Sequence, residues 1–162
     1  MSKEFIPRPY QHYAYNQIIE KPATALMLDM GMGKTVITLT AINDLLYDYF
    51  DVAKVLVIAP LRVAETTWAD ECQQWNHLAG LTISPVIGTL SERVRALKTK
   101  ADVYTINREN VVWLVDYYGK DWPFDMVVID ESSSFKNHQS KRFKALKRVR
   151  PVIKRLVELT GT

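Results

Sequence analysis

The chain has 162 residues, 48% of them apolar, which suffices for one hydrophobic core and leaves little room for a second. No segment approaches the roughly 20 uninterrupted apolar residues of a membrane span, and the N-terminus lacks the apolar region of a signal peptide. We therefore expect a cytoplasmic protein with no membrane partner. The single cysteine, Cys72, excludes an intramolecular disulfide and argues against a cysteine-based zinc site.

The net charge of +3 is unevenly distributed along the chain. Nine Lys and Arg and no acidic residue lie between Lys136 and Arg155, so the remaining twelve basic and eighteen acidic residues give −6. Such a basic stretch fits attraction to DNA, a solvated helix face, or contact with an acidic partner. If residues 140–150 are helical, Phe143, Leu146 and Val149 share one face and the cations point outward.

Short apolar runs rich in β-branched residues alternate with helical stretches. The runs are residues 23–29, 54–60, 81–87, 101–106, 124–130 and 154–160. The helical stretches are residues 33–50, 63–78, 91–100, 108–118 and 140–150. This alternation predicts an α/β fold whose mostly parallel central sheet is covered by helices. We expect Pro22, Pro60, Pro85, Pro123 and Pro151 at junctions, and ligands at the carboxyl ends of the strands.

Residues 28–38, LDMGMGKTVIT, end like a phosphate-binding loop, although Leu28 stands where the usual pattern G-x-x-x-x-G-K-[ST] has glycine. The segment has the required context, between an expected strand and an expected helix. Gly31 and Gly33 can take positive φ, so that backbone N–H groups surround an anion at the helix N-terminus. Lys34 would reach the β- and γ-phosphates, and the Thr35 hydroxyl would coordinate Mg²⁺. The alternative is an ordinary glycine turn.

A pair of carboxylates, Asp130 and Glu131, follows the apolar run MVVI that begins at Met126. Burying them without a partner would be costly. Asp130 is suited to hold Mg²⁺ through its water shell, and Glu131 to orient and deprotonate the water that attacks the γ-phosphate. The alternative is that they cap a helix N-terminus.

These motifs resemble the first RecA-like domain of a superfamily 2 helicase, and most closely that of the Swi/Snf-type DNA translocases. The resemblance runs nearly end to end, through RPYQ (8–11), DMGMGKT (29–35), APLRVAETTWADECQQW (59–75), YTINREN (104–110), DESSSFKN (130–137) and LTGT (159–162). It implies a three-layer RecA-like P-loop NTPase fold, a single ATP-binding lobe over residues 1–162, and a second RecA-like lobe further along a longer chain.

The resemblance also implies roles for individual residues. Gln11 would read the adenine edge, since its amide can both donate and accept. Lys34 and Glu131 would be catalytic, and Thr35 and Asp130 would hold Mg²⁺. The segment around the ATP phosphates would comprise Asp29, Met30, Gly31, Met32, Gly33, Lys34 and Thr35. Arg62, Asn107 and Arg108 would contact DNA. The protein would track along DNA without strong sequence preference, because phosphate contacts carry no sequence information. Coupling between the nucleotide state and DNA would involve Ser133, Thr160 and Thr162.

Two departures from the family pattern bear on activity. Ser132 and Ser133 replace the Ala-His that commonly follows Asp-Glu, so the link to LTGT would run through the Ser133 hydroxyl or be absent. The sequence stops inside this last motif, before the second lobe whose arginines stabilise the γ-phosphate charge. Arginine fingers contribute roughly 10³ to 10⁵ in rate in related hydrolases, so we expect an isolated lobe to bind ATP weakly and hydrolyse it hardly at all.

Other interpretations stay open at this point. Arg62 could be a solvated loop charge, and Asn107 a helix N-cap. The tyrosines of residues 9–19 fit the packing of a helix better than base stacking, although Tyr10 could border the adenine. A DEAD/DEAH-type RNA helicase shares the nucleotide motifs, and a stand-alone binding module for nucleic acid or protein could keep the fold without the chemistry. The intact Lys34 and Glu131 argue against such a module.

Overall fold

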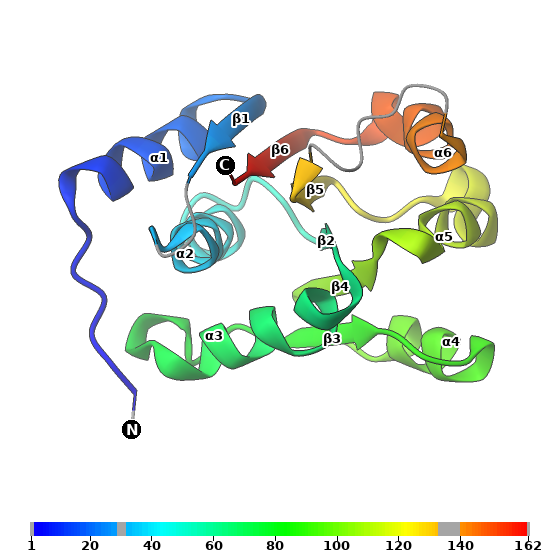
Figure 1. Ribbon diagram of the computed structural model, residues 1–162, viewed down its shortest axis with the longest axis horizontal. Helices are drawn as coiled ribbons and strands as arrows, with labels where there is room; N and C mark the ends of the chain where they lie inside the picture. Colours follow the sequence, from blue (N-terminus) through cyan, green and yellow to red (C-terminus); the bar gives the residue numbers. More distant parts are fainter. Residues whose placement is uncertain (1, 29–31, 133–139, 162) are drawn as a thin grey trace.

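A computed structural model describes residues 2–28, 32–132 and 140–161, and its core is a six-stranded sheet flanked by helices (Figure 1). The strands are β1 (Ala23–Met27), β2 (Val55–Ala59), β3 (Ile83–Val86), β4 (Val103–Asn107), β5 (Met126–Asp130) and β6 (Arg155–Thr160). The helices are α1 (Pro9–Glu20), α2 (Lys34–Tyr47), α3 (Trp68–Gln74), α4 (Leu90–Lys98), α5 (Val111–Tyr118) and α6 (Lys141–Val149). Each expected strand and helical stretch is found, with ends shifted by a few residues.

All strand pairs of the sheet are parallel, in the order β1-β6-β5-β2-β4-β3. The strands β2, β4 and β5 are buried along their whole length, as their continuous apolar runs predicted. Because the strands are parallel, their carboxyl ends meet at one edge of the sheet. Asp130 ends β5 and Asn107 ends β4 there.

The sheet is covered on both faces, which makes three layers. Side chains of α1, α2 and α3 pack on one face with alternate strand residues such as Val57 and Val128, while α4, α5 and α6 pack on the other with Ile58 and Ile129. Figure 1 shows the two helical layers to the left and right of the strands. The predicted α/β fold with a mostly parallel sheet is confirmed.

Pro85 was expected at a junction, and this expectation is wrong. It lies inside β3, paired with Thr105 of β4. The strand β3 is at the edge of the sheet and has a hydrogen-bonding partner on one side only. A proline is tolerated there because its missing N–H costs no ladder hydrogen bond on the open side.

The helix after β2 is not a regular α-helix. Helical geometry begins at Leu61, passes through a π-helical segment η1 (Val63–Thr67), continues as α3 and is followed by a 3-10 turn, η2 (Asn76–Leu78). The expected stretch 63–78 is therefore three consecutive pieces. A π-helical turn inside an α-helix is uncommon and is often found near functional sites.

The N-terminal segment crosses from α3 to α1. Lys3 forms a parallel bridge with Trp75, and the ring of Phe5 packs edge-on against Trp75 and stacks on His77. This segment therefore forms one wall beside α1 and α2. In the part of the chain that the structure describes, no helix has the length and apolar character required to cross a membrane.

Candidate active site

Gly33, directly before α2, has a backbone conformation that suits a phosphate loop. Gly33 is the N-cap of α2 with φ +78°, in the left-handed region that side chains disfavour. A Cβ on Gly33 would lie 2.7 Å from Nε2 of Gln11 and 3.3 Å from Cγ1 of Val36. Glycine is thus favoured here by conformation, and a Cβ would displace the Gln11 amide. Asp29, Met30 and Gly31, also expected around the phosphates, lie outside the described residues.

Lys34 and Asp130 meet although ninety-five positions separate them in the chain. The Lys34 ammonium lies 3.0 Å from Oδ1 of Asp130, and the two side chains are 18% and 2% exposed. This Oδ1 makes no hydrogen bond of regular geometry within the described residues, so the ion pair is its main stabilisation. Lys34 and Thr35 open α2, and the Thr35 side chain is also largely buried. Lys34 of the expected loop and Asp130 of the expected acid pair are therefore brought together.

The second oxygen of Asp130 has a partner that the sequence did not reveal. The indole Nε1 of Trp68 donates to Oδ2 of Asp130 over 3.2 Å. Trp68 is fully buried at the start of α3, among the core residues on the α1, α2 and α3 face of the sheet. The carboxylate is thereby held from two elements, α2 through Lys34 and α3 through Trp68.

Glu131 has an unusual backbone conformation. Its φ is +59°, in the left-handed region, and its side chain is exposed. Left-handed geometry costs a non-glycine residue roughly 1–2 kcal/mol. Such strain is concentrated at functional sites. The turn separates the two acids, since Asp130 is buried at the end of β5 while Glu131 projects toward solvent. Residues 133–139, which a helix N-cap at this pair would involve, lie outside the described residues.

Gln11 is attached to the phosphate loop. Its Nε2 donates to the Met32 carbonyl over 3.2 Å, and its Oε1 accepts from the backbone N–H of Arg8 at 2.8 Å. The Tyr10 hydroxyl donates to the same Met32 carbonyl over 3.3 Å. The Gln11 amide retains one N–H and one acceptor lone pair for a ligand. Gln11, Met32, Gly33 and Lys34 are thus brought together by the fold.

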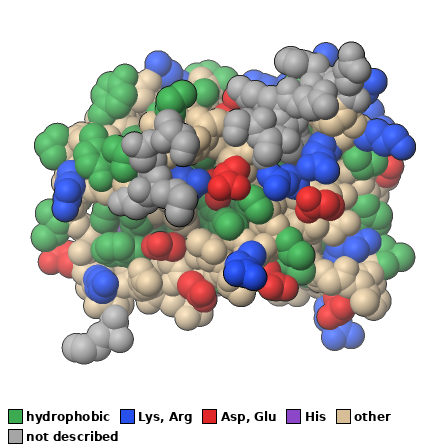
Figure 2. Space-filling view, viewed as in Figure 1, with side chains coloured by type: hydrophobic (Ala, Val, Ile, Leu, Met, Phe, Trp, Pro, Cys, Tyr) green, Lys and Arg blue, Asp and Glu red, His purple; other side chains and the backbone are tan. Residues whose placement is uncertain are grey.

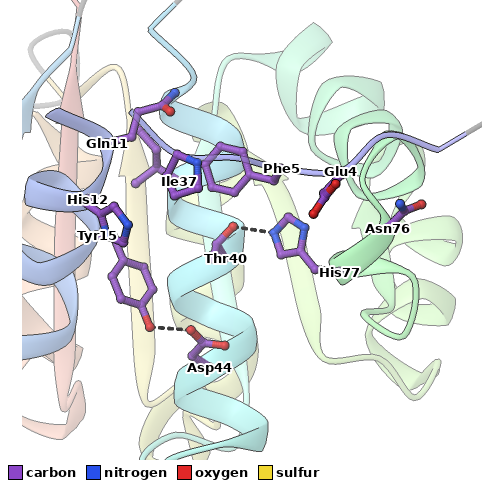
Figure 3. A pocket seen from close by; sticks show the side chains of 11 residues that line it. Glu4, Phe5, Gln11, His12, Tyr15, Ile37, Thr40, Asp44, Asn76 and His77 are labelled. Atoms are coloured by element: carbon purple, nitrogen blue, oxygen red, sulfur yellow. Dashed lines mark hydrogen bonds between the residues drawn. The ribbon is translucent and has the colours of Figure 1, made fainter. Parts of the chain in front are cut away.

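A cavity of about 500 Å³ lies beside Gln11 (Figure 3). Side chains of α1, α2, η2 and the N-terminal segment line it, including Phe5, Ile37, Thr40 and His77. Among the lining residues, Tyr15 donates a short hydrogen bond to Asp44, and Thr40 bonds to Nε2 of His77 at 2.7 Å.

Partial burial is the largest influence on the pKa of Asp44 and of His77. It raises the pKa of Asp44, although the Tyr15 hydrogen bond opposes the increase. It lowers the pKa of His77, with the charge of Asp44 acting in the opposite direction. The lining of the cavity therefore combines apolar side chains, such as Phe5 and Ile37, with polar and titratable groups.

The residues expected to contact DNA follow two neighbouring strands. Ala59 of β2 pairs with Asn107 of β4, so Arg62 and Arg108 come from adjacent strand ends. Arg62 is exposed. Exposure fits both a solvated loop charge and a residue that contacts DNA phosphates. The side chain of Asn107 is buried and donates to Glu109 over 3.1 Å, without capping a helix by its side chain. Arg108 pairs with the same Glu109 at 3.6 Å.

The pKa of Glu109 is influenced by two nearby cations. Burial works to raise the pKa of Glu109, but the hydrogen bond from Asn107 and the charges of Arg108 and Arg142 outweigh it and lower the pKa. Arg142 belongs to α6, so the charge of the basic helix acts on Glu109. Figure 2 shows Lys and Arg side chains gathered over α6, at the upper right of this face.

The basic helix α6 packs as predicted. Leu146 and Val149 are buried and Phe143 is partly buried against the same core. Several cations of the stretch 136–155 already have acidic partners: Arg148 pairs with Asp116 at 2.7 Å, and Lys154 and Arg155 both pair with Asp51. Lys136 lies outside the described residues. Part of the positive charge therefore stabilises the fold.

The coupling residues are only partly within the described chain. Ser133 and Thr162 lie outside the described residues. Thr160 ends β6, and its hydroxyl donates to the Leu26 carbonyl of β1 over 3.3 Å. Ser132 is fully buried, and its Oγ has no hydrogen-bond partner among the residues that the structure describes.

The site fits a magnesium-bound nucleotide in three respects. Gly33 forms a turn that any Cβ would fill, at the N-terminus of the fourteen-residue helix α2. Lys34 places a cation where phosphates would bind. Asp130 provides a buried carboxylate oxygen without a hydrogen bond of regular geometry, and Mg²⁺ prefers oxygen ligands.

Comparisons with known proteins identify the family of the chain. A family model described as SNF2-related domain matches residues 12–162. Putative protein p41 of Acyrthosiphon pisum secondary endosymbiont phage 1 is 43% identical, over 99% of this chain and 36% of its own length. The SWI/SNF-related matrix-associated actin-dependent regulator of chromatin subfamily A-like protein 1 of Xenopus tropicalis is 31% identical, over 95% of this chain and 15% of its own.

A solved structure shows the same fold. The Sulfolobus solfataricus SWI2/SNF2 ATPase core in complex with dsDNA superposes with a TM-score of 0.79 and 26% identity, covering 98% of this chain and 32% of that one. The chain thus spans about a third of the phage relative and of this ATPase core. The chain belongs to the SNF2-related domain family, with the RecA-like fold of a Swi/Snf-type superfamily 2 ATPase.

Proposed function

We propose that residues 1–162 form one ATP-binding lobe of an ATP-dependent DNA translocase or helicase, which a second RecA-like lobe completes in a longer protein. One observation carries the proposal: the Lys34 ammonium and the buried Asp130 carboxylate, from distant segments, meet at 3.0 Å beside a glycine turn. A fold alone does not need this pair, since a buried ion pair contributes little net stability. A nucleotide site needs both groups.

The nucleotide would occupy the loop and the adjoining cavity. Its phosphates would bind at the N-terminus of α2, where backbone N–H groups and Lys34 provide positive charge. Its base would enter the cavity beside Gln11, whose remaining N–H and lone pair match the donor and acceptor of an adenine edge. Because Gln11 also holds the Met32 carbonyl, base recognition and loop conformation would be connected.

Thr35 and Asp130 would hold Mg²⁺. When bound, the ion neutralises charge on the phosphates and orients them for in-line attack. The Lys34 ammonium would leave Asp130 and bind the phosphates, where it would stabilise their negative charge. Glu131 would hold the attacking water and accept its proton, since its carboxylate directly follows Asp130 and is exposed to solvent. An isolated lobe lacks the arginines of its partner, so turnover would be slow.

DNA would run along the strand ends that carry Arg62, Asn107 and Arg108. The similar ATPase core was solved with dsDNA, and the vertebrate relatives are named as SWI/SNF-related regulators of chromatin, which supports the DNA branch over an RNA helicase. The exposed Arg62 and the cluster around Arg108 offer phosphate contacts, which position a duplex without reading its sequence. The phage relative supports a phage or bacterial source.

Nucleotide binding provides the first test. Fluorescent ATP titrated with Mg²⁺ should bind the wild-type chain, and Lys34→Ala should weaken binding at least about 100-fold, as expected for loss of a charge-assisted phosphate contact in a partly buried site. The control Lys98→Ala removes an exposed lysine at the end of α4 and should bind like wild type. Wild-type affinity in Lys34→Ala would refute the site.

DNA binding provides the second test. Labelled duplex DNA should bind in fluorescence anisotropy with strong salt dependence, and Arg62→Ala or Arg108→Ala should lower the slope of log K against log salt by about 1. Lys120→Ala, in the turn after α5, is the matched loss of one positive charge away from these strand ends. Binding of RNA in preference to duplex DNA would favour the RNA-helicase alternative. DNA binding without any nucleotide binding would favour a non-catalytic module.

A further inference from the structure

The hydrogen bond between Trp68 and Asp130 ties the proposed metal carboxylate to the helix that begins at Leu61. The indole N–H of Trp68 is fully buried and has one acceptor, Oδ2 of Asp130, at 3.2 Å. Buried Trp N–H groups need such a partner, but a backbone carbonyl would serve equally well. Here the partner is the acid on which the nucleotide site depends.

The two oxygens of Asp130 are made different by this contact. Oδ2 accepts from Trp68, while Oδ1 lies 3.0 Å from the Lys34 ammonium at the loop. Asp130 is 3% exposed, so water does not compensate for a lost partner. A carboxylate held at one oxygen has a fixed rotation about its side-chain bonds, and its other oxygen then has a defined direction.

The same helix has a second buried tie to the sheet. The Thr105 hydroxyl of β4 donates to the Ala64 carbonyl over 2.6 Å, within the π-helical segment. Ala64 lies between Arg62, at the start of the helix, and Trp68. The helix is therefore fixed to β4 two residues before Asn107 and to β5 at Asp130, and it cannot move without disturbing one of these bonds.

We propose that Trp68 is a positioning residue for magnesium and ATP: its indole N–H holds Oδ2 of Asp130, so that Oδ1 alone is presented to Lys34 and to the metal. The inference rests on the proposed function, because it assigns Asp130 to the metal. It adds that the helix bearing Arg62 also orients the metal carboxylate. Trp68 itself touches neither the nucleotide nor the reacting atoms.

The hydrogen bond can be tested without nucleotide. The chain has four tryptophans, so ¹H–¹⁵N spectra should contain four indole signals, and Trp68→Phe identifies the signal of Trp68 by its loss. Asp130→Asn removes the negative charge from the acceptor and should move the Trp68 signal more than the other three. The indole of Trp75 bonds to Glu71 at 2.7 Å, so Glu71→Gln should instead move the Trp75 signal. If Trp68→Phe fails to fold, Trp75→Phe, Trp113→Phe and Trp122→Phe assign the other three signals and leave that of Trp68. An unmoved Trp68 signal in Asp130→Asn would overturn the proposal.

Magnesium dependence provides the functional readout. Affinity for fluorescent ATP is measured in EDTA and in excess Mg²⁺ for wild type, Trp68→Phe and the control Trp75→Phe. Loss of a group that orients a metal ligand costs about 10–100-fold in metal affinity, so Trp68→Phe should need at least about ten times more Mg²⁺ for half-maximal enhancement. Its affinity in EDTA should match wild type, since Lys34 and the loop are intact. Trp75→Phe should behave like wild type in both conditions.

The outcomes separate the two claims. Normal wild-type binding with an unchanged Mg²⁺ requirement in Trp68→Phe would overturn the role of Trp68 and leave the proposed function standing. An equal loss of affinity with and without Mg²⁺ would mean general disruption and would also overturn it. Absence of nucleotide binding by the wild-type chain would overturn the proposed function and the metal role together.

Discussion

The Lys34–Asp130 pair predicts an asymmetric effect of two substitutions on stability. Lys34→Ala leaves a carboxylate that is 2% exposed with the Trp68 indole as its remaining described partner. Removing one partner of a buried ion pair costs about 3–5 kcal/mol, and the 18% exposure of Lys34 reduces this to about 2–4 kcal/mol of unfolding free energy. The result should be a folded but clearly destabilised protein.

Asp130→Asn should cost less, about 1 kcal/mol. The asparagine oxygen can still accept from Trp68, and the ammonium of Lys34 reaches water more readily than the carboxylate does. In Lys34→Ala/Asp130→Asn no buried charge remains, so the double variant should be more stable than Lys34→Ala. A favourable coupling of about 1–3 kcal/mol between the two sites should follow.

Urea unfolding followed by circular dichroism, in buffer free of Mg²⁺ and nucleotide, measures the three variants against wild type. Lys34→Ala should have the lowest midpoint, and the double variant should regain stability without regaining nucleotide binding. Equal stability of Lys34→Ala and wild type, or a double variant less stable than both single ones, would refute the description of Asp130 as a buried ion that depends on Lys34.

Three further outcomes follow from the described residues. Glu131→Gly should be at least as stable as Glu131→Ala. Glycine removes about 1–2 kcal/mol of left-handed strain at φ +59° and loses about 0.5–1 kcal/mol to backbone entropy. If chemical denaturation shows Glu131→Ala to be the more stable variant, the backbone at residue 131 is not strained. Burial raises the pKa of the Cys72 thiol to about 12, so iodoacetamide at pH 8 should modify it only in the unfolded chain, and rapid modification of folded protein would show that it is accessible. The hydrogen bond from Lys154 lowers the pKa of Asp51; Arg155 adds to this effect and burial opposes it. The ionised Asp51 therefore stabilises the fold above its unfolded pKa, near 3.8. This contribution is lost as the pH falls through the lower pKa of the folded state. Asp51→Asn should destabilise the protein at pH 7 and have little effect at pH 2, and a cost independent of pH would exclude the ion pair as its cause.

The fold was predictable because its signals are local and repeated. The runs that became β2, β4 and β5 are apolar throughout, as strands buried on both faces must be, and the helices between them carry regular apolar spacing. Pro85 was misplaced because the sequence does not reveal the order of strands. Only once β3 is known to be an edge strand does a proline inside it become unremarkable.

The part of the site that is formed by residues of short sequence motifs was predictable. Gly33 needs positive φ, Lys34 follows it, and Asp130 ends a buried strand, so their meeting followed from the motifs and from parallel topology. The left-handed backbone of Glu131 carries no sequence signal, because acidic residues are common in every kind of turn. It appears only when the strand and the following turn are built together.

Trp68 could not have been identified from the sequence. A tryptophan at a helix position normally indicates core packing, and Trp68 is indeed fully buried. Its contact with Asp130 depends on the helical phase set by the π-helical segment, which inserts an extra residue per turn between Arg62 and Trp68. Residue spacing alone would have placed the indole on another side of the helix.

A crystal structure of the chain with Mg²⁺ and a non-hydrolysable ATP analogue tests the central claim most directly. The account predicts phosphates around Gly33 and Lys34, the metal near Thr35 and Asp130, and the base beside Gln11. The Lys34 ammonium should have left Oδ1 of Asp130 for the phosphates, while Trp68 keeps its bond to Oδ2. A nucleotide bound elsewhere, or one that leaves the Lys34–Asp130 contact at its present 3.0 Å without touching either residue, would contradict it.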